Sequence, residues 1–350
     1  MVDRFQGLLL GTAVGDALGL PTEGLSARRA ARMFRPPLRH RFILGRGMVS
    51  DDTDHSVFVA QSILAHPRSA ERFAGRLAWN LRFWLLSLPA GVGFATLRSI
   101  LKLWVGVPAE RSGVFSAGNG AAMRAAPIGA FLYRRPEELK AFVAAASRLT
   151  HSDPRAEIGA RAVAKIAALA IAGQQRPEFA VFLDALQSAG PTDAAWQKLV
   201  SQIESASRDG LSVPDFARSI GATDGVSGFV FQTVPVVAYA WYVHYGSFRD
   251  SLQSVIECGG DTDTTGAIVG ALAGAAVGVS AIPGEWVAGL AEYPRGVSFL
   301  NELGRQLEIA SVSPELARPV RYFWPAVVPR NLLFLLVVLM HGFRRLLPPY

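Results

Sequence analysis

Two short groups of carboxylate and hydroxyl side chains stand far apart in the sequence, and each comes just before an apolar segment. The first acidic group consists of Ser50, Asp51 and Asp52, and the second consists of Asp261, Asp263 and Thr264. Neighbouring carboxylates repel each other and raise each other's pKa unless a cation compensates their charge. Oxygen ligands of this kind suit hard divalent cations such as Mg²⁺ or Mn²⁺. The pair of groups therefore predicts a metal site, whereas either group alone is typical of a capped helix N-terminus.

Other kinds of catalytic centre find little support in the sequence. The six histidines show no close ligand spacing and the chain has one cysteine, Cys258, so a zinc site is disfavoured. The sequence contains neither a phosphate-binding P-loop nor a GxSxG nucleophile motif. A single cysteine also excludes an internal disulfide and fits a reducing compartment, and we therefore expect a cytoplasmic protein.

The segments that must position the two groups are predicted to be helices. The chain has 350 residues, 50% of them hydrophobic, and can bury a large core. Strand-like alternation is almost absent, and helices are expected over 53–65 and 264–279, directly after the two groups. The Ala and Gly residues of 264–278 indicate close packing near the centre of the fold, while 205–227 is the most loop-like span of the chain. These patterns predict an all-α fold, an orthogonal multi-helix bundle.

Five sequence blocks give the chain its resemblance to a known family. They are GLLLGTAVGDALGLPTE at 7–23, SDDT at 50–53, SAGNGAAMRAAPIG at 116–129, LTHSDP at 149–154 and GGDTDTTGA at 259–267. In this order the blocks resemble the ADP-ribosylglycohydrolase family, which includes the dinitrogenase reductase-activating glycohydrolases. The resemblance implies an all-α fold around a binuclear metal site, usually of Mg²⁺ or Mn²⁺. It also implies hydrolysis of the bond between the terminal ribose of ADP-ribose and an acceptor.

The resemblance further implies which residues hold the metal ions and move protons. All six residues of the two acidic groups would be metal ligands. Either Asp52 or Asp261 would act as the base toward a metal-activated water, and the sequence does not choose between them. Glu23 would approach the metal site and gate it, whereas without the resemblance it is a solvent-facing residue near a helix end.

Substrate contacts are implied at two further blocks. Ser116, Gly118 and Asn119 would form a cradle for phosphate or ribose, because small residues with free backbone N–H groups suit such ligands. His151 would contact the adenosine or phosphate side of the substrate. The alternatives are an ordinary turn and cap for the first block and a structural histidine for the second.

The sequence departs from the family pattern at two points. Ser50 stands where threonine is more usual, which keeps the hydroxyl and loses a methyl group. Some relatives carry an acidic residue between the first acidic group and the glycine-rich block, but no Asp or Glu occurs here from Arg72 to Ala109. We therefore expect recognition of the acceptor to differ.

The leading hypothesis is a metal-dependent hydrolase that removes ADP-ribose from a modified protein side chain, with arginine favoured as the acceptor. A serine linkage and an ADP-ribosyl small molecule stay open as substrates. The competing functions are a two-metal phosphoester hydrolase, a non-catalytic ADP-ribose-binding module and an immunity protein that binds a transferase. The last of these would not need the metal ligands.

Arginine dominates the basic residues of this chain, whose formal net charge is +7. Seven arginines lie between Arg28 and Arg46, just before the first acidic group. A phosphate or nucleic-acid patch is one interpretation, but a solvated loop is favoured. No base-reading or aromatic motif accompanies the cluster, so we expect no specific nucleic-acid partner.

The motif-bearing region predicts one domain over 1–310, followed by an apolar and basic tail over 311–350. The tail has an apolar run from Leu332 to Met340, flanked by Arg330 and Arg344. These nine residues are too few to span a bilayer, which needs about 20. A helix docked on the domain, or a contact with a partner, is favoured over interfacial attachment to a membrane.

Overall fold

Helices make up about two thirds of the chain and the two strands only four residues, which confirms the all-α prediction. The computed structural model describes residues 1–348, which form seventeen α-helices, five short 3₁₀ helices and two strands of two residues each. The α-helices are α1 (Val2–Gly19), α2 (Ala27–Met33), α3 (Asp51–Ala65), α4 (Ala70–Leu86), α5 (Phe94–Trp104), α6 (Ala126–Phe131), α7 (Pro136–Arg148), α8 (Pro154–Ala172), α9 (Phe179–Gln187), α10 (Ala194–Arg208), α11 (Val213–Ser219), α12 (Val230–Val243), α13 (Phe248–Ile256), α14 (Thr262–Val277), α15 (Gly284–Ala288), α16 (Val297–Val312) and α17 (Val327–Arg344). The 3₁₀ helices are Leu20–Thr22, Ala109–Arg111, Asn119–Ala121, Val279–Ala281 and Trp324–Ala326, and the strands are β1 (Leu25–Ser26) and β2 (Gly259–Gly260).

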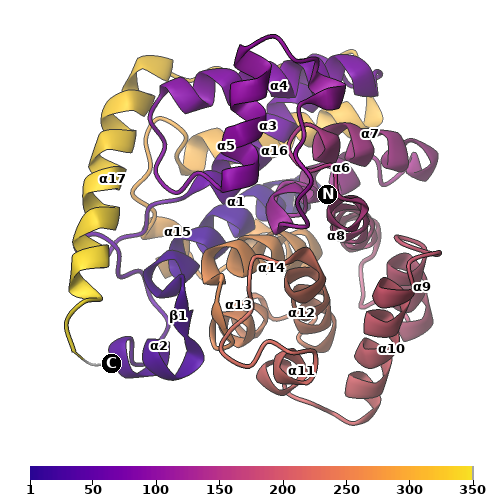
Figure 1. The fold of residues 1–350 in the computed structure, drawn as a ribbon. Coiled ribbons are helices and arrows are strands. Elements are labelled where there is room, and N and C mark those ends of the chain that lie inside the picture. The colour runs from indigo at the N-terminus through magenta and orange to yellow at the C-terminus, as the bar shows by residue number, and fades with distance from the viewer. Residues whose placement is uncertain (349–350) are drawn as a thin grey trace.

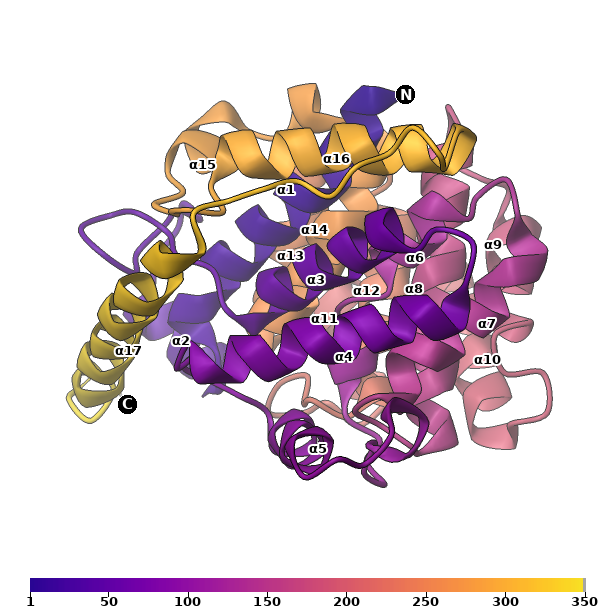
Figure 2. The ribbon, with the colours of Figure 1, turned by 90° about the horizontal axis from the view of Figure 1, so that it is seen from above.

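Helices α1 and α14 lie at the centre of the molecule and contact each other through glycines (Figure 2). A Cβ atom built on Gly7, Gly11 or Gly15 would lie 2.3, 2.1 or 2.0 Å from the carbonyl oxygen of Gly274, Gly270 or Gly266. The pairing order shows that the two helices run antiparallel. No side chain larger than hydrogen fits at these points, so the two backbones lie in direct contact. Both helices are almost wholly buried, as expected for helices that are apolar on all faces.

This contact brings the end of α1 next to the start of α14. The Thr262 hydroxyl donates to the carbonyl oxygen of Gly19 at 2.9 Å and lies 3.0 Å from the Thr22 hydroxyl. Strand β1, which follows the turn at Glu23, pairs antiparallel with β2, which precedes the second acidic group. The second acidic group therefore begins beside the segment that carries Glu23.

Helix α17 lies at the edge of the molecule in both views (Figures 1 and 2). It packs onto the domain through a stripe of buried residues at helical spacing, namely Val327, Asn331, Phe334 and Val337. Among residues 1–348, the segment Trp324–Arg344 is the one helix long and apolar enough to cross a membrane by length and composition. Its mean hydropathy is 1.8, and 22% of its apolar window is buried.

Two local expectations differ from the structure. The span 205–227, the most loop-like of the sequence, holds the end of α10, which was expected, and also the helix α11, which was not predicted. Ser212 starts α11 by accepting a hydrogen bond from the Asp215 backbone at 3.2 Å, and Pro214 occupies the first turn, where it is tolerated. Helix α3 begins at Asp51, two residues earlier than expected, so part of the first acidic group lies inside the first helical turn.

The glycine contact predicts a large loss of stability from a small substitution. In Gly15→Ala the new methyl group would lie 2.0 Å from the Gly266 carbonyl oxygen, so the two helices must move apart. We expect the free energy of unfolding to fall by about 1–3 kcal/mol, measured by urea denaturation. Gly75→Ala is the control, since Gly75 is an exposed residue of α4 whose added Cβ meets nothing within 4 Å. This variant should gain about 0.5–1 kcal/mol, and a Gly15→Ala protein as stable as the wild type would contradict the close contact.

Candidate active site

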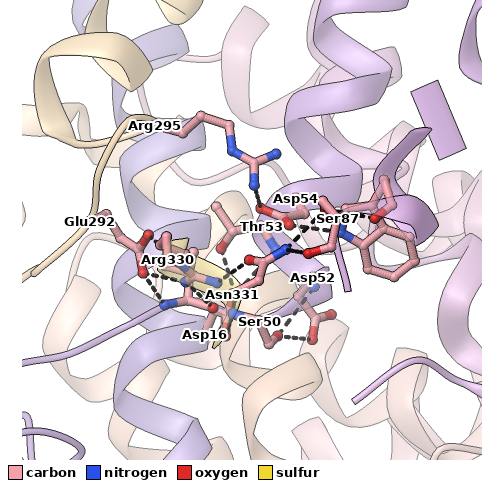
Figure 3. Close-up of polar contacts among 12 residues, drawn as sticks. Asp16, Ser50, Asp52, Thr53, Asp54, Ser87, Glu292, Arg295, Arg330 and Asn331 are labelled. Atoms are coloured by element: carbon pink, nitrogen blue, oxygen red, sulfur yellow. Dashed lines mark hydrogen bonds and ion pairs between the residues drawn. The ribbon is translucent and has the colours of Figure 1, made fainter. Parts of the chain in front are cut away.

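Asp16 on α1 fixes the backbone at the start of α3 (Figure 3). Its two carboxylate oxygens accept from the Ser50 N–H at 3.0 and 2.9 Å. Oδ2 also accepts from the Thr53 N–H at 3.1 Å and from the Thr53 hydroxyl at 2.6 Å. Burial raises the pKa of Asp16 to about 7, and the hydrogen bonds from Thr53 and Ser50 act in the opposite direction. A carboxylate of the central helix thus sets the position from which the first acidic group projects.

The two acidic groups meet at the carboxylate of Asp52. The Ser50 hydroxyl donates to Asp52 Oδ2 at 3.2 Å, and the Thr264 hydroxyl donates to the same oxygen at 3.1 Å. Asp52 is 1% exposed, and its Oδ1 atom finds no hydrogen-bond partner among the residues that the structure describes. A buried carboxylate oxygen without a partner is energetically costly. Groups that are 212 residues apart in the sequence are therefore in direct contact, around an oxygen that lacks a partner.

The second acidic group follows a sharp turn at the start of α14. Gly260 has a φ of +84°, which favours glycine, and a Cβ there would lie 2.2 Å from a backbone oxygen. Asp261 makes no capping bond to α14 within the described chain; instead its Oδ2 accepts from Asn119 Nδ2 at 2.6 Å. Asp263 Oδ1 accepts from the Thr264 N–H at 2.9 Å. A residue of the glycine-rich block, rather than the helix itself, holds Asp261 in place.

Burial raises the pKa values of Asp51, Asp52 and Asp263 well above their ordinary range, and repulsion from neighbouring carboxylates adds to the effect. The pKa of Glu23, at the rim, is raised by burial of its carboxyl group and by Asp261, while Arg345 lowers it. These shifts mark carboxylates that lack sufficient positive charge nearby. A hard divalent cation is the chemical species that would compensate them.

The donor set fits such a cation, although the carboxylates do not converge on a single point. Within residues 1–348, no three Asp, Glu, His or Cys side chains are placed to hold one metal ion together. The unpartnered oxygen of Asp52 lies beside two hydroxyl groups, those of Ser50 and Thr264. Carboxylate and hydroxyl oxygens of this kind are ligands for Mg²⁺ or Mn²⁺.

The glycine-rich block lies against the imidazole of His151. A Cβ at Gly118 would lie 3.2 Å from His151 Nε2, and one at Gly120 would lie 2.8 Å from Cε1. The Gly118 N–H donates to the Ser116 hydroxyl at 3.2 Å, which shapes the loop. Only a loop without side chains at these two positions can approach the histidine this closely.

Burial and a neighbouring buried arginine keep His151 neutral. Arg124 is 0% exposed and donates to the carbonyl oxygens of Gly120 and Ala146 and to the Thr150 hydroxyl. The Thr150 oxygen lies 2.8 Å from His151 Nδ1. Burial and the charge of Arg124 lower the pKa of His151 to about 3, so the ring is neutral near pH 7. The Thr150 hydroxyl accepts from Arg124, and we therefore assign its own hydrogen as a donor to His151 Nδ1. With Nδ1 as the acceptor, the neutral ring carries its N–H at Nε2.

A cavity of about 350 Å³ joins these parts. Every site residue expected from the sequence lines it except Asp52, which lies behind Ser50 and Thr264. The expected residues on the wall are Glu23, Ser50, Asp51, Ser116, Gly118, Asn119, His151, Asp261, Asp263 and Thr264. Carboxylates, hydroxyls, a neutral imidazole and a glycine loop thus face one space.

Helix α17 also contributes to the cavity, a role that the sequence did not reveal. Phe334 and Val338 form part of its wall. Arg345 donates to the backbone oxygen of Glu23 at 2.7 Å and to that of Pro21 at 3.2 Å. The C-terminal helix thus supplies both an apolar wall and a cation at the rim.

A buried ion pair ties α17 to the first acidic group (Figure 3). Arg330 pairs with Glu292, and both side chains are less than 10% exposed. Glu292 Oε1 accepts from the Val49 N–H at 2.7 Å, and Arg330 donates to the Val49 carbonyl at 2.6 Å. Both backbone polar groups of Val49, the residue directly before Ser50, are therefore held by this ion pair.

Comparisons with known proteins identify this arrangement. The family model described as ADP-ribosylglycohydrolase matches residues 1–316. The chain belongs to the ADP-ribosylglycohydrolase family. Members of this family are enzymes that hydrolyse glycosidic bonds of ADP-ribose, and this glycohydrolase shares their sequence pattern over nearly its whole length. The matched region ends before α17 begins.

Individual relatives cover most of the glycohydrolase. It is 28% identical to the ADP-ribosyl-[dinitrogen reductase] glycohydrolase of Rhodospirillum rubrum, over 82% of this chain and 90% of that protein. It is also 28% identical to the ADP-ribosylarginine hydrolase Tri1 of Pseudomonas putida, over 82% of this chain and 74% of that protein. A solved structure titled ADP-ribosylglycohydrolase-related protein complex matches with a TM-score of 0.68 and 26% identity, covering 89% of this chain and 99% of that one.

Three contributors to the site were not assigned from the sequence, namely Asp16, Arg124 and α17. Asp16 is the single charged residue between Arg4 and Glu23, Arg124 is the single charged residue of 116–129, and that isolation was the available signal. A buried charge requires partners, but the sequence does not say which partners. The contribution of α17 could not be predicted from its sequence, because an apolar sequence does not indicate which part of the domain the helix packs against.

Removing the Asp16 carboxylate should destabilise the glycohydrolase even in the presence of a chelator. Asp16→Ala leaves the donors of Ser50 and Thr53 without their acceptor, at about 1–3 kcal/mol for each buried donor left unpaired. The measurement is urea denaturation in EDTA. Asp3→Ala is the control, because Asp3 on the same helix makes only exposed contacts with Ser280. Equal, small losses in both variants would show that Asp16 does not hold the start of α3.

The depressed pKa of His151 predicts a pH-dependent stability. Below about pH 6.5 the unfolded chain binds a proton at His151, and the folded chain does not until about pH 3. The free energy of unfolding should therefore decrease as the pH is lowered through this window, and His151 should contribute up to about 1.4 kcal/mol per pH unit to the decrease. Denaturation of wild type and His151→Gln at pH 7, 6 and 5 isolates the effect, because the carboxylates titrate in both proteins. A stability difference that does not change with pH would contradict the neutral imidazole.

Proposed function

We propose that the chain is a divalent-cation-dependent hydrolase that cleaves the glycosidic bond between ADP-ribose and a modified protein side chain, with arginine as the favoured acceptor. The observation that carries the proposal is that two acidic groups, a glycine-rich loop and His151, from four separate parts of the chain, line one cavity. Membership of the ADP-ribosylglycohydrolase family supports it. The free, buried thiol of Cys258 is consistent with a cytoplasmic enzyme.

Two cations, Mg²⁺ or Mn²⁺, would be held by the two acidic groups. The ligands would be Ser50, Asp51 and Asp52 on one side and Asp261, Asp263 and Thr264 on the other. Bound there, the ions would supply the positive charge that the carboxylates lack and would polarise a water molecule. The unpartnered oxygen of Asp52 and the raised pKa values of its neighbours support this assignment.

Asp261 is the better candidate for the base that takes a proton from the attacking water. Its carboxylate lines the cavity and is oriented by Asn119 at 2.6 Å, whereas Asp52 lies behind the wall with 1% exposure. A base must be within hydrogen-bond reach of the proton that it removes. The surrounding carboxylates would also stabilise the positive charge that develops at the anomeric carbon. Glu23, at the rim of the cavity, is placed to gate entry.

Substrate would be held by neutral donors that line the same cavity. The Nε2–H of His151 and the backbone of the loop from Ser116 to Gly118 suit a phosphate or ribose oxygen. Phe334 and Val338 add an apolar surface to this cavity. Neutral N–H donors can bind an anionic substrate without forming ion pairs with the nearby carboxylates, which stay available to the cations.

The acceptor is proposed to be a guanidinium group. Glu23 lines the cavity and is not one of the proposed cation ligands, so its carboxylate would be available to favour a cationic acceptor. The similarity to a protein named ADP-ribosylarginine hydrolase supports this choice. Serine-linked or small-molecule ADP-ribosyl substrates are the alternative, because the segment that brings Gly93 and Phe94 to the cavity has no acidic residue.

Release of free ADP-ribose from matched arginine-linked and serine-linked peptides, followed by chromatography, tests the proposal. Reactions with Mg²⁺, with Mn²⁺ and with EDTA test the dependence on cations. We expect release from the arginine linkage in the presence of either cation and no release in EDTA. Inorganic phosphate as the product would instead indicate phosphoester hydrolysis, and tight ADP-ribose binding without turnover would indicate a binding protein.

Loss of single carboxylates should reduce turnover while the fold is retained. An amide is a poorer ligand for a hard cation and cannot accept the proton. We expect Asp261→Asn and Asp52→Asn each to lower kcat/KM by about 10² to 10⁴-fold. The control is Asp250→Asn, since Asp250 is an exposed residue of α13 whose carboxylate accepts from the Ser247 hydroxyl and does not line the cavity. Turnover near the wild-type level in both site variants would refute the proposed centre.

A further inference from the structure

Helix α17 has two faces of different character. Its inner stripe packs on the domain and lines the cavity through Phe334 and Val338. Its outer face is apolar as well, and in both ribbon views α17 lies at the edge of the molecule (Figures 1 and 2). This α17 outer face consists of Leu332, Leu333, Leu336, Leu339, Met340 and Phe343, each between 46% and 69% exposed. Six large apolar side chains at helical spacing form a continuous exposed stripe, and patches of this kind mark interaction surfaces.

Arginines and no acidic residues accompany this stripe. Residues 24–50 contain seven arginines, residues 316–348 contain five, and neither segment contains an Asp or Glu. The two segments are neighbours in space. The rings of Phe42 and Phe334 lie 5.7 Å apart, His341 Nε2 lies 2.6 Å from the Phe42 carbonyl oxygen, and Arg29 bonds the backbone of Arg345. The segment that carries the exposed apolar stripe and the neighbouring segment thus both contain arginines and no carboxylate.

We propose that the α17 outer face is a docking surface for an anionic lipid bilayer, on which the helix lies parallel to the membrane plane. Helices that bind in this way bury an apolar face at the headgroup boundary and direct basic residues toward anionic lipids. Exposed arginines at the end of α17 and in the neighbouring segment, such as Arg344, Arg35 and Arg39, are available for this purpose. The turn next to Phe42 adds Leu44, which is 99% exposed.

The inner contacts of α17 argue for a helix that lies on the membrane rather than one that crosses it. Arg330 forms a buried ion pair with Glu292, and Asn331 Nδ2 donates to the Ser87 carbonyl at 2.8 Å. A helix withdrawn into a bilayer would leave the Glu292 carboxylate buried without its cation, which is strongly unfavourable. When α17 lies on the membrane surface, its apolar outer face is removed from water, and its contacts with the domain and the cavity wall stay intact.

Charge argues for lipid rather than a second copy of the chain. Two copies that paired through α17 would bring two arginine-rich surfaces together, and neither segment supplies a carboxylate to compensate them. Like charges brought together in this way oppose association. An anionic headgroup layer supplies the missing negative charge, so the observations favour the bilayer. The inference is independent of the proposed reaction.

Co-sedimentation of the full-length protein with lipid vesicles tests the inference. The vesicles are phosphatidylcholine alone, or phosphatidylcholine with about 30% phosphatidylserine, a typical anionic lipid. We expect binding to the anionic vesicles, weaker binding at high salt, and little binding to the neutral ones. Equal binding to both kinds of vesicle, or no binding to either, would overturn the proposal.

Variants locate the surface. Leu336→Ser, Met340→Ser and Phe343→Ser combined should weaken anionic-vesicle binding by about 100-fold or more, because three apolar side chains are removed from the interface. Arg344→Gln alone should weaken it about fivefold. The control is Val181→Ser, since Val181 is 45% exposed on α9, on the opposite side of the molecule from α17 (Figure 1). Circular dichroism and thermal unfolding check that each variant is folded.

Two other results would favour different occupants. A wild-type dimer in lipid-free solution that the triple variant converts to monomer would show that the face binds a second copy. Protein that stays in cell membranes after alkaline carbonate extraction would show that the helix spans the bilayer. Either result would overturn a peripheral lipid-docking surface.

Discussion

The structure depends on the direct backbone contact between α1 and α14. Glycines on both helices allow their carbonyl groups to touch the opposite backbone, with no space for a methyl group. One end of this pair holds Asp16, and the other helix begins with the second acidic group. Because Asp16 also fixes the first turn of α3, a single packing contact determines the separation of both acidic groups. The packing of the core therefore determines the geometry of the candidate active site.

Around this pair, Arg124 and Arg330 orient polar groups and form no ion pair with the carboxylates that line the cavity. Arg124 acts on His151 through Thr150, and Arg330 with Glu292 clamps the residue before Ser50. The acidic residues of the cavity keep raised pKa values as a result. The arrangement favours cations from solution as their partners, which is consistent with the proposed cation-dependent chemistry.

The sequence was sufficient to predict the helical fold class and the family, because apolar periodicity and ordered motifs are local signals. It also indicated the two acidic groups, and the structure places Thr264 in contact with Asp52. It did not reveal the function of Asp16, since the partners of a buried carboxylate lie 34 and 37 residues away. Nor did it predict that α17 lines the cavity, or that α11 interrupts 205–227, where a serine cap outweighs a polar, glycine-containing composition.

The central claim is that the two acidic groups form one binding centre for divalent cations. The most direct test is a crystal of the full-length protein grown with Mn²⁺, with anomalous scattering used to locate the ions. The account predicts two strong manganese peaks at the junction of the groups, with Asp52 and Asp261 on opposite sides, and their loss in Asp52→Asn. Manganese bound at one group only, or no anomalous peak near Asp52 in a folded protein, would contradict it.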